Sequence, residues 1–400
     1  MRPKNTQYLF IDMNSFFASS EQEKHISLRH QPVAVTPTNV SSGCIISASY
    51  EAKAFGIRTG TKVGEAKLIC PQIIIKESDV NLYLDFHEKM IKTLSDFSPF
   101  VTIKSIDEAV IKLTPREQNS TTALKLAKDI KAKIKIILGQ YMRASIGIGP
   151  NVWLSKMAAE SKKPDGLVEL KIKDLPNFFR KLELTDLKGI NFRLAKRLNG
   201  LGIYRPIDLF NTDVETLRKK MGLAGDYWHL RMHGATIDTF NSQTKTIGHS
   251  HVLAPIMRTW PKAWAVCQKL VEKTARRLRE NKLAAQKIQL LLIFSSRTHW
   301  KKSVSVLPFS DSQTMTKTIY NLWQEIPKEN QPIKIAMSVS NLQPNSQARK
   351  LFPAEEKLDK LYSAVDKIND KFGSFTIKPA NILNAHDAAP NRIAFGRSIF

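Results

Sequence analysis

The order of apolar and polar positions in the first 165 residues predicts an α+β domain. Short apolar runs are typical of buried strands, and they lie at 8–11, 32–35, 44–50, 100–103, 109–113 and 144–148. Apolar residues at helical spacing predict helices over 83–97 and over the lysine-rich segment 122–138. With residues 19–71 left aside, the order is strand, helix, strand, strand, helix, strand. This order predicts a split βαβ fold, an antiparallel sheet with helices on one face.

The rest of the chain divides into further segments. Residues 19–71 interrupt the βαβ order, so we expect an insertion with a small fold of its own. The turn residues 164–166 mark a boundary, after which residues 166–233 are predicted to form short helices. The polar residues 234–242 carry no pattern and are predicted to be a linker. Beyond them, residues 243–350 alternate again, with an extended segment, a long helix and strands at 246–253, 260–281, 286–294, 302–306 and 333–342.

Length and charge narrow the possible functions. A chain of 400 residues is too long for one ordinary core, so an α+β multidomain protein is expected. The formal net charge is +25, and a protein this basic usually meets a polyanion, nucleic acid first. Residues 243–350 alone hold 18 Lys and Arg against 5 Asp and Glu, a charge of +13. The alternative is a basic protein whose charge serves only solubility.

The lack of a recognisable targeting signal and the scattered cysteines favour the cytoplasm as the expected location. No long apolar run follows the basic residues at the start of the sequence, so no secretory signal is expected. The longest apolar stretches, such as residues 290–294, are too short to span a bilayer. The three cysteines are scattered and have no metal-ligand spacing, which is typical of a reducing compartment.

Three acidic residues are the first candidates for chemistry. Asp12 ends an apolar strand, and Asp107 and Glu108 stand side by side at the tip of a predicted hairpin. Acids flanked by buried strands are costly unless a cation meets them. Carboxylate oxygens suit Mg²⁺, and phosphoryl transfer is a reaction that uses two such ions about 4 Å apart. The alternative is a solvated turn in which the two adjacent acids have no role. If the Asp-Glu pair were the only motif in the sequence, this alternative would be favoured.

Four motifs make the case for catalysis. The segments YLFIDMNSFFASSEQ, SYEAKAFGIRTG, SIDEA and KMAAESKKPDG occur in this order. In order and spacing the chain resembles the Y-family translesion DNA polymerases, which include DNA polymerase IV (DinB) and UmuC-like enzymes, over about residues 7–350. The resemblance implies a right hand with a split βαβ (ferredoxin-like) palm (1–18 and 72–165), fingers (19–71), a helix-hairpin-helix thumb (166–233), a linker (234–242) and an α/β little finger (243–350). Residues 351–400 form a C-terminal extension beyond the match.

The resemblance also implies a reaction and its residues. The expected activity is template-directed DNA synthesis across damaged DNA, by transfer of a nucleotide from a dNTP to a primer 3′ hydroxyl. Two Mg²⁺ ions would be held by the catalytic acids Asp12, Asp107 and Glu108, with the backbone carbonyl of Met13 as a further ligand. Asn14 stands where an acid is frequent and is not expected to be a ligand.

The nucleotide-binding residues follow from the same resemblance. Phe17 is expected to be the steric gate that excludes a 2′ hydroxyl; the alternative is a core aromatic on a helix. Four residues are expected around the triphosphate: Ser47, Tyr50, Lys53 and Lys163. Lys53 stands where Arg is frequent, so it cannot form a bidentate fork. Asn14 and the letters EAK favour the UmuC-like branch, whereas Tyr50 and FGIRTG favour polymerase IV, so the branch stays open.

DNA is expected to be held at two places. Residues 187–191 with the glycines at 200 and 202 resemble a helix-hairpin-helix, which would offer Gly189, Ile190 and Asn191 to a DNA phosphate. Asn191 replaces a glycine of the hairpin and is expected to tolerate left-handed backbone angles; the alternative is an ordinary helix turn. The basic residues 243–350 would lie along the DNA backbone without reading sequence, unless they form only a solvated basic face.

Further partners and locations are also expected. Residues 347–352 (QARKLF) resemble a bacterial sliding-clamp peptide with one additional residue, so a clamp is a possible partner besides primer-template DNA and dNTPs. The expected location is the cytoplasm, in association with the nucleoid. Two other functions compete: a non-catalytic DNA-binding scaffold with a polymerase-like fold, which the presence of all three acids disfavours, and another two-metal palm enzyme such as a nucleotidyl cyclase, which has no use for the basic residues 243–350.

Overall fold

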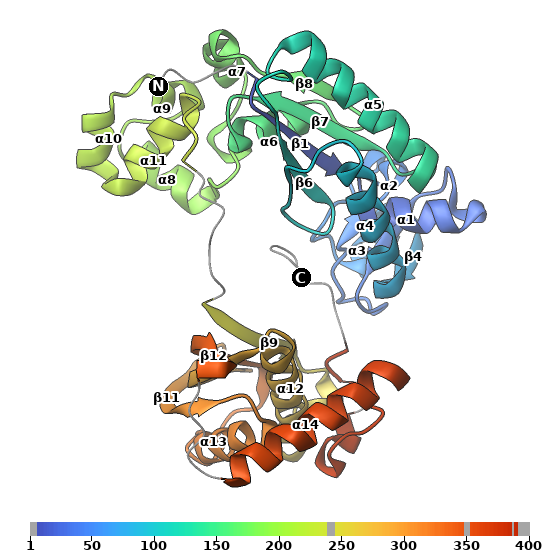
Figure 1. Ribbon diagram of the computed structural model, residues 1–400, viewed down its shortest axis with the longest axis vertical. Helices are drawn as coiled ribbons and strands as arrows, with labels where there is room; N and C mark the ends of the chain where they lie inside the picture. The colour runs from blue at the N-terminus through green and yellow to red at the C-terminus, as the bar shows by residue number, and fades with distance from the viewer. Residues whose placement is uncertain (1–5, 238–244, 348–352, 386–387, 391–400) are drawn as a thin grey trace. The chain divides into compact units, whose positions relative to one another are not determined.

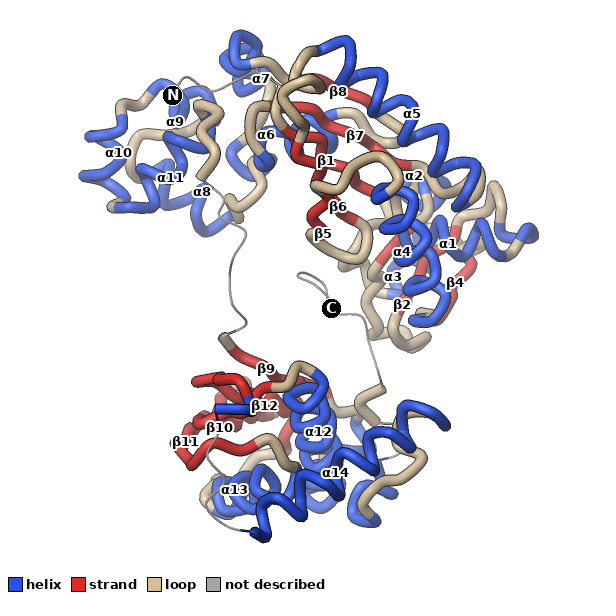
Figure 2. Tube along the Cα trace, viewed as in Figure 1, coloured by secondary structure: helices blue, strands red, loops and turns tan. Residues whose placement is uncertain are grey.

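The chain forms two compact units in the computed structural model, which describes residues 6–237, 245–347, 353–385 and 388–390. The first unit extends to Asp238 and the second spans Thr239–Asn391, so the division falls inside the predicted linker 234–242. Helices and strands alternate in both units (Figure 2). No helix in the described parts of the chain is long and apolar enough to cross a membrane.

A five-stranded sheet forms the centre of the first unit (Figure 1). Its strand order is β5-β6-β1-β7-β8, with bounds Val101–Ile103, Glu108–Lys112, Tyr8–Met13, Ala144–Gly149 and Leu167–Glu169. The first four strands pair antiparallel, and β8 is parallel to β7. The split βαβ prediction is confirmed. The sheet extends beyond the predicted boundary at residue 165, because β8 adds a fifth strand that the sequence pattern did not indicate.

Helices cover both faces of this sheet. The helices α4 (Val80–Ser95) and α5 (Ser120–Leu138) pack with Leu9 and Ile11 of β1 in one core. Tyr8 and Phe10 point to the opposite face, where they pack with residues of α6 (Val152–Ser161). The expectation of helices on one face holds for α4 and α5 and is wrong for the sheet as a whole, because α6 covers the second face.

Each of these three helices begins at a side-chain cap. Asp79, Asn119 and Asn151 each accept a hydrogen bond from a backbone N–H two or three positions into the helix. Such caps satisfy donors that the first helical turn leaves unpaired. The caps therefore fix where α4, α5 and α6 start relative to the strand that precedes each of them.

The segment beside this sheet has a small sheet of its own, with strand order β3-β2-β4. Its elements are α1 (Phe16–Lys24), β2 (Val33–Thr36), β3 (Ser47–Ala48), α2 (Tyr50–Ala54), α3 (Val63–Ile69) and β4 (Ile74–Glu77). The strand β4 pairs parallel with β2, so this sheet takes a strand from beyond the predicted end at residue 71. The helix α1 instead buries Phe16 and Phe17 in the core of the large sheet.

Short helices complete the first unit, as predicted for residues 166–233. They are α7 (Leu175–Arg180), α8 (Phe192–Asn199), α9 (Pro206–Asn211), α10 (Val214–Met221) and α11 (Leu223–Met232). Their core includes Trp153, Leu154 and Met157 of α6. The helix α6 therefore lies between the large sheet and the helical part.

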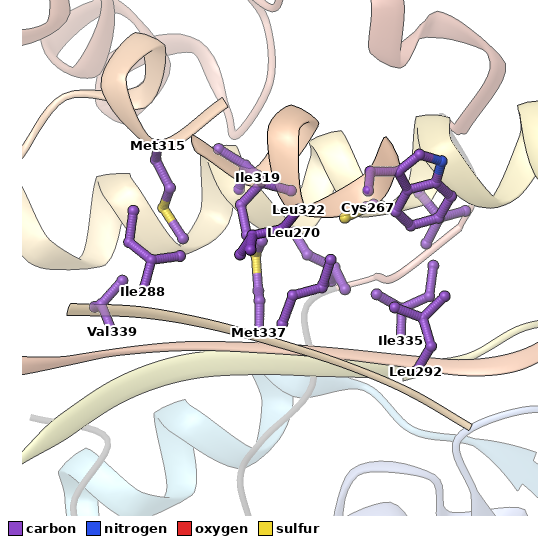
Figure 3. Close-up of a cluster of buried hydrophobic side chains, with 14 of the residues drawn as sticks. Cys267, Leu270, Ile288, Leu292, Met315, Ile319, Leu322, Ile335, Met337 and Val339 are labelled. Carbon is purple, nitrogen blue, oxygen red and sulfur yellow. The ribbon is translucent and has the colours of Figure 1, made fainter. Parts of the chain in front are cut away.

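The second unit is a four-stranded antiparallel sheet with order β11-β10-β12-β9. Its elements are β9 (Thr246–Val252), α12 (Trp260–Glu280), β10 (Leu283–Phe294), β11 (His299–Phe309), α13 (Ser312–Gln324), β12 (Pro332–Pro344) and α14 (Pro353–Phe372). Figure 3 shows side chains of the sheet, such as Ile288 and Met337, pointing toward helix residues such as Leu270 and Ile319. This one-sided packing leaves the opposite face of the sheet to other contacts.

The C-terminal extension packs on α12. Arg279 of α12 forms two hydrogen bonds of 2.6 and 2.9 Å with the carboxylate of Asp366 in α14. Arg276 donates one hydrogen bond of 2.6 Å to the carboxylate of Asp370. The extension therefore belongs to the second unit.

Candidate active site

The three predicted acids meet at the ends of two paired strands. Asp12 on β1 lies directly opposite Glu108 on β6 in the antiparallel register. Asp107 precedes β6, and its backbone carbonyl accepts a hydrogen bond of 2.9 Å from the N–H of Met13. The pairing of β1 with β6 thus brings together acids that are about a hundred residues apart in sequence.

Burial makes the negative charge at this place costly. The side chain of Asp12 is only 8% exposed, and burial raises its pKa to about 6. Lys163 opposes this shift, while Asp107 and Glu108 reinforce it. Burial also raises the pKa of Asp107, although a hydrogen bond from the Ser105 hydroxyl acts in the other direction. The acids repel one another, so positive charge is favoured beside them.

Two lysines supply part of that positive charge. The Nζ of Lys163 lies 2.7 Å from Asp12 Oδ2, and the Nζ of Lys156 lies 2.6 Å from Glu108 Oε1. Within the residues that the structure describes, no three His, Cys, Asp or Glu side chains gather closely enough to hold a metal ion. The donors are nevertheless hard carboxylate oxygens, and three acids face two lysines. This chemistry fits a divalent cation such as Mg²⁺.

The buried charge of Asp12 predicts a gain in stability from its removal. Burial raises the pKa of folded Asp12 from its ordinary value of 3.8 to about 6. Between these values the folded state binds more protons, so this group's contribution to stability falls as the pH rises from about 4 to 6. We expect Asp12→Asn to raise the thermal unfolding temperature at pH 7.5, by the equivalent of about 1–3 kcal/mol, and to have little effect near pH 4. A lower unfolding temperature at pH 7.5 would show that the Lys163 ion pair outweighs burial.

Phe17 lies at the junction of α1 and α4. Its side chain is 5% exposed and belongs to the core of the large sheet. The ring centroid is 4.5 Å from that of Tyr83 and 5.7 Å from that of Phe16. The next backbone N–H, at Ala18, donates to Ser47 Oγ at 3.3 Å. The structure therefore brings Phe17 and Ser47 together. Phe17 has the packing of a core aromatic, and its role as a gate stays a prediction.

Tyr50 and Lys53 extend positive and polar groups beside Asp12. The Nζ of Lys53 donates to Ser15 Oγ at 2.7 Å and lies 4.3 Å from the Tyr50 ring centroid. Burial lowers the pKa of Lys53, Lys163 lowers it further, and Asp12 raises it. Burial raises the pKa of Tyr50 to about 12, and Asp12 acts in the same direction. Lys53, Lys163 and a protonated Tyr50 together suit an anion.

Several contacting residues were not found from the sequence. Lys156, Ser105 and Ser15 each touch one of the candidate groups described above. Lys156 lies on α6, whereas Lys163 follows two residues after that helix ends, so no helical spacing links the two lysines in the sequence. Asn14 was not expected to be a ligand, and its side chain binds Ser145 Oγ at 3.0 Å and the Asp165 N–H at 2.7 Å.

The hairpin before α8 has the expected turn with a different division of roles. Gly189 has φ +105, and the side chain of Ile190 is buried. Asn191 has φ −92 and caps α8 by accepting a hydrogen bond of 2.9 Å from the Leu194 N–H. Asn191 does not need the left-handed backbone angles that it could tolerate, because Gly189 provides the positive φ and Asn191 provides the cap.

The predicted clamp peptide cannot be placed. Residues 348–352 lie outside the described residues, and Gln347 ends a short 3-10 turn, Asn345–Gln347. Residues 238–242 of the predicted linker also lie outside them.

Comparison with known proteins identifies the family of this fold. Residues 11–160 match the impB/mucB/samB family, and residues 244–351 match the C-terminal domain of that family. DNA polymerase IV of Pelotomaculum thermopropionicum is 32% identical over 380 residues, covering 92% of this chain and 93% of that protein. DNA polymerase IV 1 of Bacillus subtilis is 27% identical over 411 residues, covering 100% and 98%.

Solved structures agree with the fold. A Y-family DNA polymerase chimera built on Dbh superposes with a TM-score of 0.73 at 23% identity, covering 84% of this chain and 98% of that one. An insertion ternary complex of Dbh DNA polymerase gives a TM-score of 0.58, with the same coverage.

Proposed function

We propose, since the chain belongs to the impB/mucB/samB family of Y-family DNA polymerases, that Asp12, Asp107 and Glu108 are the catalytic acids of this enzyme and hold two Mg²⁺ ions. The chain is a DNA-directed DNA polymerase of translesion synthesis, and its substrates are primer-template DNA and dNTPs. The scaffold alternative is not favoured. The observation that supports the acid assignment most strongly is the direct pairing of Asp12 with Glu108, beside Asp107.

The chain's own residues have defined roles in this proposal. Asp12, Asp107, Glu108 and the Met13 carbonyl would hold the ions, which when bound activate the primer 3′ hydroxyl and neutralise the leaving pyrophosphate. Lys163 and Lys156 place positive charge against Asp12 and Glu108 through ion pairs. The triphosphate of the incoming nucleotide is bound by four residues, Ser47, Tyr50, Lys53 and Lys163. Phe17 faces the sugar of this nucleotide.

Primer extension tests this function. The unaltered chain, given a primed template, dNTPs and Mg²⁺, should lengthen the primer in a template-dependent way on a denaturing gel. A scaffold would bind the DNA without lengthening the primer. A nucleotidyl cyclase would convert the nucleotide in the absence of a primed template. The absence of extension over a range of Mg²⁺ and DNA concentrations would contradict the proposal.

We further propose that the open face of the second unit's sheet lies along DNA. Ile288 and Leu290 of β10 point to the helices, so Lys287 and Gln289 point to the opposite face. Lys301 of β11 pairs with Leu291, and Lys334 of β12 pairs with Ile293. Leu291 and Ile293 point away from the helices, so both lysines lie on the open face with Lys287. Small residues such as Ser338 lie between the lysines. A flat face with spaced lysines suits phosphate contacts without sequence readout.

Salt dependence tests this face. The fragment 243–391 keeps α14 on α12 and should bind primer-template DNA by itself, with affinity that falls steeply as salt rises. Replacing Lys287, Lys301 and Lys334 with Gln should reduce the slope of log K against log salt by roughly 2–3. The matched control replaces Lys262, Lys317 and Lys328, which are exposed on or beside the helices. Fluorescence anisotropy at several salt concentrations gives the slopes; equal slopes for both triple variants would contradict the assignment.

Three finer assignments complete the proposal. Gly189, Ile190 and Asn191 present the hairpin backbone and the start of α8 to a DNA phosphate. Residues 347–352, which resemble a clamp peptide in sequence, bind a sliding clamp. The enzyme acts in the cytoplasm at the nucleoid, where its template lies.

A further inference from the structure

The helix α6 is fixed against the large sheet by a very close approach. A Cβ atom added to Gly147 of β7 would lie 2.0 Å from the backbone oxygen of Ser155. Only glycine therefore permits the observed distance between helix and strand. The hydroxyl of Ser155 also donates to the Tyr8 carbonyl of β1 at 3.1 Å. The helix is accordingly packed directly on the sheet and hydrogen-bonded to the strand that carries Asp12.

The opposite side of α6 is bound to the hairpin before α8. The indole Nε1 of Trp153 donates to the Lys188 carbonyl at 2.8 Å. Trp153 also packs edge-to-face on Trp228, with ring centroids 5.7 Å apart at 84°. Trp228 in turn lies 3.5 Å from the position of a Cβ on Gly189. The Nζ of Lys188 reaches Glu160 of α6 at 2.5 Å.

A second attachment joins the start of α6 to the end of α11. The side-chain amide of Asn151 donates to the carbonyls of Arg231 at 2.8 Å and Ala235 at 3.0 Å. Its oxygen accepts from the Leu154 N–H and caps α6. The helical part of the unit is therefore held to α6 at three points along the helix, by Asn151, Trp153 and Glu160.

The same helix presents its lysine to the acids. Lys156 lies less than one turn after Trp153 and pairs with Glu108. Lys163, which pairs with Asp12, follows two residues after the helix ends. One helix thus contacts the hairpin through Trp153 and Glu160 and the carboxylates through Lys156, from residues at helical spacing on the same face.

We propose that Trp153 is a positioning residue that fixes the hairpin 188–191 relative to Asp12 and Glu108. This inference rests on the proposed function, in which the hairpin grips a DNA phosphate and the acids perform the chemistry. The distance between hairpin and acids then sets where the primer end lies in the site. A displacement of about 1 Å between reacting groups can lower a rate about a hundredfold, so a loosened hairpin lowers the rate of nucleotide addition even when DNA stays bound.

Two conservative substitutions test the inference. Trp153→Phe keeps an aromatic ring and removes the N–H that binds the Lys188 carbonyl. Asn151→Asp keeps the cap on α6 and removes the donor to Arg231 and Ala235. Trp260→Phe is the matched control, because the Trp260 Nε1 also donates to a lysine carbonyl, that of Lys328, but in the second unit.

The readouts are single-turnover primer extension, the dNTP concentration for half-maximal rate, and DNA affinity by anisotropy. Trp153→Phe and Asn151→Asp should each lower the maximal rate about tenfold or more, with the half-saturating dNTP concentration and the DNA affinity within about threefold of the parent. Trp260→Phe should leave the maximal rate within about twofold.

Three outcomes would overturn the inference. The first is an unchanged maximal rate in both test variants. The second is an effect on the half-saturating dNTP concentration in place of the maximal rate. The third is an equal loss of maximal rate in Trp260→Phe, which would indicate a general effect of tryptophan removal on stability. These results differ from failure of the proposed function, in which the unaltered chain itself would not extend a primer.

Discussion

Replacing Asp107 or Glu108 with Ala should lower primer extension by about a thousandfold or more. Glu108 begins β6 directly opposite Asp12, and Asp107 precedes β6 and accepts a backbone hydrogen bond from Met13. Their loss removes charge that would hold the divalent cations, and such cations contribute several kcal/mol to the transition state of phosphoryl transfer. A loss of about 4 kcal/mol corresponds to three powers of ten in rate.

The design of this test separates catalysis from folding. Asp85→Ala is the matched control, because Asp85 is an acid of the same unit that is exposed and pairs with Lys89 on α4. The control should extend primers at the parental rate. Both test variants should still bind primer-template DNA, since the hairpin and the second unit are untouched. Appreciable extension by Asp107→Ala and by Glu108→Ala would place the catalytic acids elsewhere.

The fold was predictable where an element buries one face or lies at the centre of a sheet. The strand β1 (YLFIDM) is buried along its whole length, and such a run shows as a continuous apolar segment. The helix α4 buries Tyr83, Phe86 and Met90 on one side, which gives the helical period. These patterns sufficed for the split βαβ order.

Other elements carried no such pattern. The strand β8 has three residues, and it forms because β7 offers it a partner. The helix α6 is buried on two sides, between the sheet and the helical part, so its apolar residues do not form a single stripe. The helix α13 is different, because it was missed although it buries Met315, Ile319 and Leu322 at helical spacing and Asp311 caps it.

The site was predictable as a set of residues but not as a set of contacts. The order and spacing of four motifs identified Asp12, Asp107, Glu108 and Lys163. The pairing of Lys156 with Glu108 joins residues 48 positions apart, and it exists only because α6 crosses the sheet at Gly147. The capping role of Asn191 was not predicted for a similar reason. A residue that follows a glycine can cap the next helix or adopt left-handed backbone angles, depending on where that helix begins. The backbone angles of the folded chain distinguish the two cases.

The last prediction concerns selection between deoxyribonucleotides and ribonucleotides. Phe17 lies five residues after Asp12 and next to the Ala18 N–H that binds Ser47. If its ring faces the sugar of the incoming nucleotide, Phe17→Ala removes the clash with a 2′ hydroxyl. Clashes in a packed site cost about 1–3 kcal/mol, so discrimination against ribonucleotides should fall about ten- to a hundredfold.

The measurement must separate this loss from a loss of stability. A buried Phe→Ala substitution costs about 3–5 kcal/mol of folding free energy, which lowers the fraction of folded enzyme. The ratio of kcat/KM for a dNTP to that for the matching ribonucleotide is independent of this fraction, because both substrates meet the same folded molecules. Phe16→Ala is the matched control, since Phe16 is the neighbouring residue on α1 and is buried in the same core. If Phe17 is the gate, only Phe17→Ala lowers the ratio; if Phe17 is only a core residue, both variants lose stability and both ratios stay at the parental value.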